Sequence, residues 1–252
     1  MRFDLLGRRE LTPTDVRRLV FEAVGIIADT QRTLDLPICP HIEETREILR
    51  GGEFKAESLP KNRGCYHAAE YGAFEPPSTI ILDSKLPFCD RPFSMPQLPN
   101  TLAHYCATHE VIHADDHTGG DLLLRATKGH IMRDHKDKLK RGMAIIEGKR
   151  GGECIRGYDD LACLWALQYV DMVAHYKSYT VLRHNGLPKL DFIWTGLGDN
   201  YFPPNLLKCI EDHEGIDHVF DALTEQAGEY CLIEALDESE TIKKKNMDRY
   251  TV

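Results

Sequence analysis

Apolar residues recur at helical spacing along most of the chain, so the pattern predicts a mainly helical protein. Residues 12–34 form the first such segment, and either Thr12 or Thr14 is suited to cap it. In residues 41–54 the pattern predicts a short helix that a glycine pair ends. Residues 158–186 are apolar on most of their circumference, which predicts a long helix at the centre of the fold.

Two short strands and a run of further helices complete the predicted elements. Residues 64–74 and 78–86 are typical of strands, with a turn at Glu75, Pro76 and Pro77 between them. A proline-rich stretch then leads into a predicted helix that begins near Pro99 and ends near the glycine pair Gly119–Gly120. Beyond it, the spacing predicts helices over residues 121–146 with a break near Gly129, 204–211 and 216–236, and a loop-rich region over 187–204.

The helix predicted over residues 99–117 carries the sequence HExxH. Cys106, His109 and His113 fall on one stripe of that helix, which we expect to face inward. Residues four apart lie on the same helical face, so both histidines can offer ring nitrogens to a single metal ion. Glu110 then projects beside the ion. The motif predicts a metal site with His109 and His113 as ligands and Glu110 as the catalytic base.

Zinc suits this arrangement because it lowers the pKa of its bound water towards about 7 and polarises a carbonyl group. A glutamate beside the ion accepts the proton of that water and passes it to the leaving amine. HExxH recurs in zinc peptidases for this reason. The pattern therefore indicates a zinc-dependent hydrolase, and the expected substrate is a peptide or protein.

From Gly64 to Ile146 the chain resembles the zincin metallopeptidases, in which two strands and a long connection precede an HExxH helix. The resemblance covers about a third of the chain. It implies a mixed sheet packed on the motif helix, a catalytic zinc and hydrolysis of peptide bonds. We therefore expect an α+β fold, mostly helical, that forms a single zincin-like domain over residues 1–252. Its core would span about residues 64–146, with additional helices over residues 150–240.

A catalytic zinc generally has three protein ligands, so a third must follow the histidine pair. His117 is one candidate, but on a continuous helix it lies about 12 Å from His109 along the axis, at about 1.5 Å per residue. It qualifies only if the helix ends near Ala114. In SprT-like zincins the third ligand is a histidine that opens a later helix, and the stretch DHKDKLKRGM resembles that opening. The resemblance favours His135, with Asp134 as the cap.

The match to the SprT-like pattern is not complete, so other ligands stay open. Leu139 stands where an aromatic residue is common, and His130 is the next candidate. The metzincin pattern HExxHxxGxxH is not met, because Asp116 and Gly119 occupy its last two defined positions. A gluzincin-type site would use a glutamate on a later helix. The glutamates available for that role are Glu147, Glu153, Glu229 and Glu234.

Several side chains are candidates for supporting roles around the ion. His175 follows Asp171 by one turn of the long predicted helix, so the pair could be a ligand and the carboxylate behind it. A carboxylate near the motif could accept a hydrogen bond from the outer nitrogen of a ligand histidine, and a tyrosine could stabilise an oxyanion. The residues available for these two roles are Asp115, Asp116, Asp121, Tyr158 and Tyr176.

The net charge, the lengths of the apolar runs and the cysteines argue against several classes of protein. The formal net charge of −9 argues against a general nucleic-acid binder, whose surface is usually basic. No apolar run approaches the roughly 18 residues of a membrane span, and we expect no signal peptide. The eight cysteines include no CxxC pair, which argues against a zinc ribbon. Unpaired cysteines indicate a reducing, cytoplasmic compartment.

Two other interpretations fit parts of the sequence. Glu110 and His113 form half of the paired Glu-x-x-His ligand set of di-iron helical bundles, but the later predicted helices contain no second copy. A zincin-like module that binds metal without hydrolysing a substrate would also retain the motif. Absence of hydrolysis with the metal still bound would identify that non-catalytic module.

Overall fold

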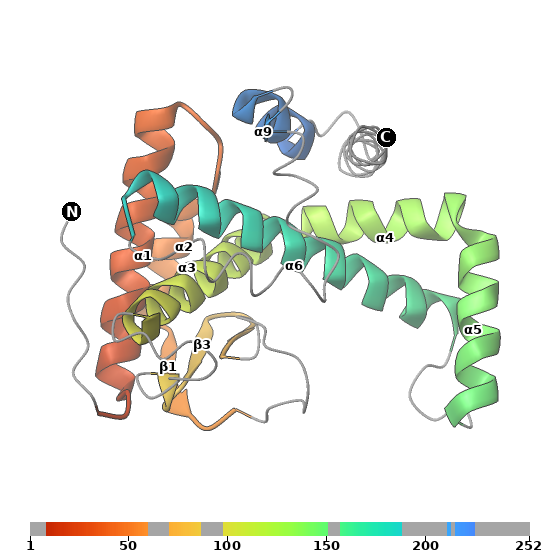
Figure 1. Cartoon of the computed structure of the whole chain (residues 1–252), viewed down its shortest axis with the longest axis horizontal. Coiled ribbons are helices and arrows are strands. Elements are labelled where there is room, and N and C mark those ends of the chain that lie inside the picture. The colour runs from red at the N-terminus through yellow and green to blue at the C-terminus, as the bar shows by residue number, and fades with distance from the viewer. Residues whose placement is uncertain are drawn as a thin grey trace, which may run out of the picture. The chain divides into compact units, whose positions relative to one another are not determined.

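The fold is α+β, as the sequence predicts. A computed structural model describes residues 9–59, 71–86, 98–150, 157–187, 211–212 and 215–224. These residues are mostly helical and include a small three-stranded mixed sheet (Figure 1). Within the described ranges, no helix is both long and apolar enough to cross a membrane.

The chain divides into two compact units, which we describe separately. The first comprises residues 1–120 and 174–204, and the second comprises residues 121–173 and 205–252. The long helix α6, Tyr158–His184, has residues in both units. It confirms the helix predicted over residues 158–186, with nearly the same bounds. The expectation of a single domain over residues 1–252 stays a prediction.

The helices of the first unit form where the apolar spacing predicts them. They are α1 over Pro13–Leu34, α2 over Ile42–Arg50 and α3 over Leu98–Thr118. The apolar stripe of α1 is buried from Val16 to Ile27, and this helix packs against both α2 and α3. α3 also contacts strands β2 and β3. The HExxH helix therefore lies against the sheet, as expected.

The sheet has one strand more than the sequence analysis predicts. Its strands are β1 over Glu53–Glu57, β2 over Gly72–Glu75 and β3 over Thr79–Asp83, in the order β1-β3-β2. β1 runs parallel to β3, whereas β2 runs antiparallel to it across the predicted Pro76–Pro77 turn.

Strand β1 begins within residues 41–54, for which the sequence predicts only a short helix ended by a glycine pair. The chain enters the sheet at Gly52, where its backbone lies close to that of Ser78. A Cβ atom at Gly52 would lie 2.3 Å from the carbonyl oxygen of Ser78, so only glycine lets the chain enter the sheet there. The residues of the predicted strand 64–74 that precede Tyr71 lie outside the described ranges.

The second unit contains α4 over Leu122–Asp134, α5 over Lys136–Arg150, the first part of α6, and α9 over Ile216–Thr224. Its core brings together buried side chains of α4, α5 and α6. These are Ile131, Leu139, Leu161, Ala162 and Ala166. The predicted helix over 204–211, and the end of the one over 216–236, fall largely outside the described residues.

We expected the helix break in this unit near Gly129, but it lies at His135. The amide of His135 donates to the carbonyl of Ile131, and its own carbonyl accepts from the amide of Leu139. His135 thus ends one helix and opens the next. Gly129 lies inside α4, where the cost of about 1 kcal/mol for a helical glycine is smaller than the gain from burying Ile131 and Leu139.

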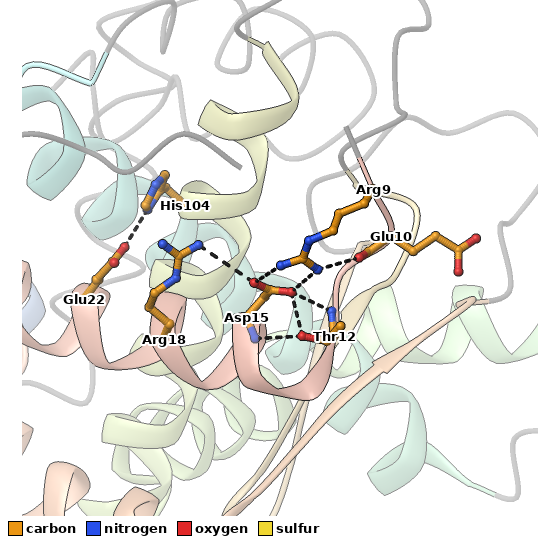
Figure 2. Close-up of polar contacts among 7 residues, drawn as sticks. All are labelled: Arg9, Glu10, Thr12, Asp15, Arg18, Glu22 and His104. Atoms are coloured by element: carbon orange, nitrogen blue, oxygen red, sulfur yellow. Dashed lines mark hydrogen bonds and ion pairs between the residues drawn. The ribbon is translucent and has the colours of Figure 1, made fainter. Parts of the chain in front are cut away.

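The beginning of α1 is held by a capping box (Figure 2). The hydroxyl of Thr12 accepts from the amide of Asp15 at 3.3 Å, and the Asp15 carboxylate accepts from the amide of Thr12 at 2.9 Å. The guanidinium of Arg9 donates to both oxygens of this carboxylate, at 2.7 and 2.9 Å. The bond from Arg9, helped by Thr12, holds the pKa of Asp15 well below its usual range. The structure therefore selects Thr12 over Thr14 as the cap.

We expect Thr12→Ala to lower the free energy of unfolding by about 1 kcal/mol, which is typical for loss of a side-chain cap. Thr14→Ala is the matched control, because Thr14 is exposed in the first turn of the same helix. Urea denaturation of both variants measures the difference. Equal losses in the two variants would contradict the assignment of Thr12 as the cap.

Candidate metal centre

Helix α3 brings the two motif histidines together as their spacing predicts. His109 is buried and His113 is half-buried, and their Nε2 atoms lie 3.0 Å apart. Two nitrogens that bind one tetrahedral zinc at its usual bond length would lie about 3.3 Å apart. The observed separation fits a shared ion, although a single N–H···N hydrogen bond fits the distance as well. A further ligand is needed to distinguish the two.

Asp171 offers a carboxylate that could serve as this ligand. Its carboxylate and one ring nitrogen from each of His109 and His113 all lie within 4.8 Å of one another. Asp171 is half-buried on α6, one turn before His175, whose ring packs against His109. Ligand atoms around a tetrahedral zinc are about 3.3 Å apart, so closure of this group on an ion needs shifts of about 1 Å. Two imidazoles and one carboxylate are a donor set that suits zinc.

Glu110 lies beside the histidine pair and against the backbone of strand β2. Its side chain is buried, with 3% of its surface exposed. A Cβ atom at Gly72 would lie 2.6 Å from Oε1 of Glu110 and 3.0 Å from its Cγ. Gly72 therefore lets the carboxylate rest directly on the strand, which fixes where a base in this position can act. Sequence analysis did not identify Gly72, because this close approach depends on tertiary packing.

A second buried histidine, His175, lies next to His109. The ring of His175 lies 4.2 Å from that of His109, and the hydroxyl of Tyr105 lies 3.2 Å from His175 Nδ1. The sequence allows His175 as a ligand with Asp171 behind it, but in the described residues the carboxylate of Asp171, and not the ring of His175, belongs to the group of possible ligand atoms. Tyr105 was missed, although its position four residues before His109 puts it on the same face of α3.

The predicted third ligand, His135, belongs to the second unit of the chain, where it lies between α4 and α5. Among the described residues, the group of ligand atoms contains neither His135 nor His130. The rings of these two histidines instead lie 5.3 Å apart at the junction of α4 and α5. Asp134 is the last residue of α4 and does not open α5, because His135 occupies the position before that helix. The role of His135 as a ligand stays a prediction without support from this geometry.

The other predicted ligands are His117 of α3 and four glutamates. α3 continues to Thr118, so the condition for His117, an end near Ala114, is not met. The ring of His117 packs instead on Phe74 of β2, at 5.7 Å. Of the glutamates, Glu147 lies within α5. Those outside the described residues are Glu153, Glu229 and Glu234.

The aspartates near the motif have mainly structural contacts. Asp115 is buried and accepts a hydrogen bond from the hydroxyl of Thr45 on α2, at 3.3 Å. Burial raises the pKa of Asp115 to about 6, although the nearby Lys177 and His41 oppose that shift. Asp121 precedes α4 in a left-handed conformation, and its side chain makes no capping hydrogen bond. Asp116 is half-buried near the end of α3.

Neither tyrosine considered for the oxyanion role is shown at the candidate site. Tyr158 is exposed and precedes Asp171 by about 20 Å along α6, at about 1.5 Å per residue. That separation is too great for both side chains to reach one reacting group. Tyr176 is fully buried, one residue after His175.

We expect Gly72→Ala to destabilise the protein by about 1–3 kcal/mol, the usual cost of overpacking a buried site. The new methyl group would collide with Glu110, so the cost should fall by at least half when Glu110→Ala is made in the same chain. Gly129→Ala is the control, since a Cβ atom there meets nothing within 4 Å. Denaturation of the single and double variants measures the coupling. Strictly additive costs would contradict the close approach of β2 to Glu110.

Comparison with known proteins adds nothing to this geometry. No model of a known protein family matches the chain, and no curated protein or solved structure matches it either. The likeness to zincins therefore rests on the motif and on the order of the strands and the motif helix. The arrangement of α3, β2 and α6 carries the functional argument.

Proposed function

We propose that the protein is a zinc-dependent hydrolase of peptide bonds. In this proposal His109, His113 and Asp171 are the zinc ligands, and Glu110 is the general base. The proposal is carried by one observation, the convergence of two ring nitrogens and a carboxylate within 4.8 Å beside a buried glutamate. Three protein ligands leave the fourth position of a tetrahedral zinc open, as catalysis requires.

The surroundings of Glu110 suit a base in this reaction. A zinc ion in the site would supply Lewis acidity towards the substrate carbonyl and lower the pKa of the attacking water. Glu110 would take a proton from that water and deliver it to the leaving nitrogen. Burial of the carboxylate among α3 and β2 strengthens its electrostatic interactions with the reacting groups.

A peptide substrate is favoured by the position of β2. Among the described strands it lies at the edge of the sheet, with β3 on one side only. An edge strand offers unpaired backbone groups that can bind an extended peptide as an added strand. Because β2 touches Glu110 through Gly72, a chain bound along it would pass close to the base.

We place this activity in the cytoplasm. Cys39, Cys106 and Cys163 are free cysteines in the described part of the chain, and the first two are buried. Buried free thiols are typical of proteins that fold in a reducing compartment. The negative net charge agrees with a protein that does not bind nucleic acid.

Metal analysis of purified variants tests the ligand set. We expect about one zinc per wild-type chain, with loss of most of it in His109→Ala and in Asp171→Ala. His135→Ala should retain the ion. Asp160→Ala is the matched control, since Asp160 is an exposed aspartate on the same helix. Retention in Asp171→Ala with loss in His135→Ala would instead support the ligand predicted from the sequence.

The same analysis should quantify iron and manganese beside zinc. Two histidines and one carboxylate are also the ligand set of non-haem iron(II) oxygenases. A protein that holds iron in preference to zinc after purification would contradict the hydrolase and point to that second chemistry.

Glu110→Gln should keep the metal and lose hydrolytic activity, because the amide is no base but has nearly the shape of the carboxylate. We expect a fall of about 100-fold or more in the rate at which a casein or quenched-peptide mixture is cleaved. Wild-type activity in this variant would rule out Glu110 as the base. A wild-type protein that binds zinc and cleaves none of these substrates would support the non-catalytic module instead.

A further inference from the structure

The candidate centre is backed by an ordered series of aromatic rings in the first unit. Tyr105, His109 and His113 follow one another at intervals of four residues on α3, and His175 of α6 stands between the first two. Ring centroids are 5.9 Å apart for Tyr105 and His175, 4.2 Å for His175 and His109, and 4.6 Å for His109 and His113. The first three side chains of this series, Tyr105, His175 and His109, are each 3% exposed or less.

His175 is held in place by two contacts with one hydroxyl group. The Tyr105 hydroxyl lies 3.2 Å from Nδ1 of His175 and 3.2 Å from the carbonyl oxygen of the same residue. A hydroxyl can donate once and also accept. Both contacts are satisfied when the hydroxyl donates to the carbonyl and accepts from an Nδ1–H group. Tyr105 therefore anchors the ring and the backbone of His175 together.

The position of His175 restricts the ring of His109. The two rings are inclined by only 32°, so His175 covers one face of the His109 ring at close range. The ring of His113 meets that of His109 nearly at a right angle, at 84°. Rotation of the His109 ring about its Cβ–Cγ bond would drive it into one of these neighbours. Its Nε2 atom is thereby kept on the side of His113, where the ligand atoms converge.

We propose that Tyr105 and His175 are positioning residues that preorganise His109 for metal binding without binding the metal themselves. This inference rests on the metal centre of the proposed function. It names two residues outside the HExxH motif on which the affinity of the site depends. Outer contacts of this kind usually contribute 10–100-fold to metal affinity.

The test is the zinc affinity of the full chain, measured by competition with a chromophoric chelator. We expect Tyr105→Phe to weaken binding by about 10-fold and His175→Ala by about 10–100-fold, with one zinc still bound at saturation. His175→Phe keeps a flat ring behind His109 but cannot bond to Tyr105, so its affinity should lie between those of wild type and His175→Ala. Tyr179→Phe is the matched control, as Tyr179 is a buried tyrosine on α6 whose ring contacts Arg183.

A double-variant cycle distinguishes positioning from general stability. Combining Tyr105→Phe with His175→Phe should weaken zinc binding by less than the sum of the two single effects, because both variants remove the contact between the Tyr105 hydroxyl and Nδ1 of His175. The free energy of unfolding of the metal-free variants is measured in parallel. Variants that are destabilised but bind zinc as tightly as the wild type would overturn the proposal, because the pair would then serve packing only.

Two other results would also overturn this proposal, and each can be distinguished from the other. Complete loss of zinc in His175→Ala and His175→Phe, as severe as in His109→Ala, would make His175 a ligand. A wild-type chain that binds no zinc would remove the proposed function and this inference with it. If His175→Ala does not fold, Tyr105→Phe and His175→Phe still decide the question, since each keeps an aromatic ring in place and removes the contact between the Tyr105 hydroxyl and His175 Nδ1.

Discussion

The candidate centre depends on the burial of polar side chains around helix α3. Helix α3 carries His109 and Glu110 into the interior, where a polar side chain is costly unless it has a partner. Each neighbouring element makes a specific contact with α3. These contacts are Glu22 of α1 with His104 at 3.8 Å (Figure 2), Thr45 of α2 with Asp115, Gly72 of β2 with Glu110, and His175 of α6 with His109.

This arrangement gives α3 one orientation relative to its neighbours in the first unit. A rotation of the helix would separate several of these polar pairs at once, so the fold and the site constrain each other. The proposed metal site would therefore follow from the packing of α3. Its rigidity comes from buried contacts on several sides, and rigid placement of ligands is what a catalytic metal needs.

The local part of this account could be predicted from the sequence. Helical spacing alone brings His109 and His113 to one face, and short-range signals predict a cap at Thr12 or Thr14 and a turn at Gly119–Gly120. Gly120 indeed has a positive φ of 85°, which permits the chain to turn after α3. Strand β1 was missed because Gly52 enters the sheet through a contact with Ser78, which is distant in sequence.

The non-local part could not be predicted. A third ligand must come from beyond α3, and spacing along the sequence cannot choose between His135 and Asp171. Only the packing of His175 against His109 identifies the face of α6 that returns to the motif. Tyr105 and Gly72 could not be predicted either, since their roles arise from partners that tertiary structure brings to them.

The central claim is that two histidines of α3 and one carboxylate of α6 bind a single ion. A crystal structure of the zinc-loaded protein, with anomalous scattering recorded at the zinc edge, tests it most directly. We expect one anomalous peak within about 2.0–2.2 Å of His109 Nε2, His113 Nε2 and a carboxylate oxygen of Asp171. A peak bound by the two histidines and a ring nitrogen of His135 or His130, with Asp171 elsewhere, would contradict the account.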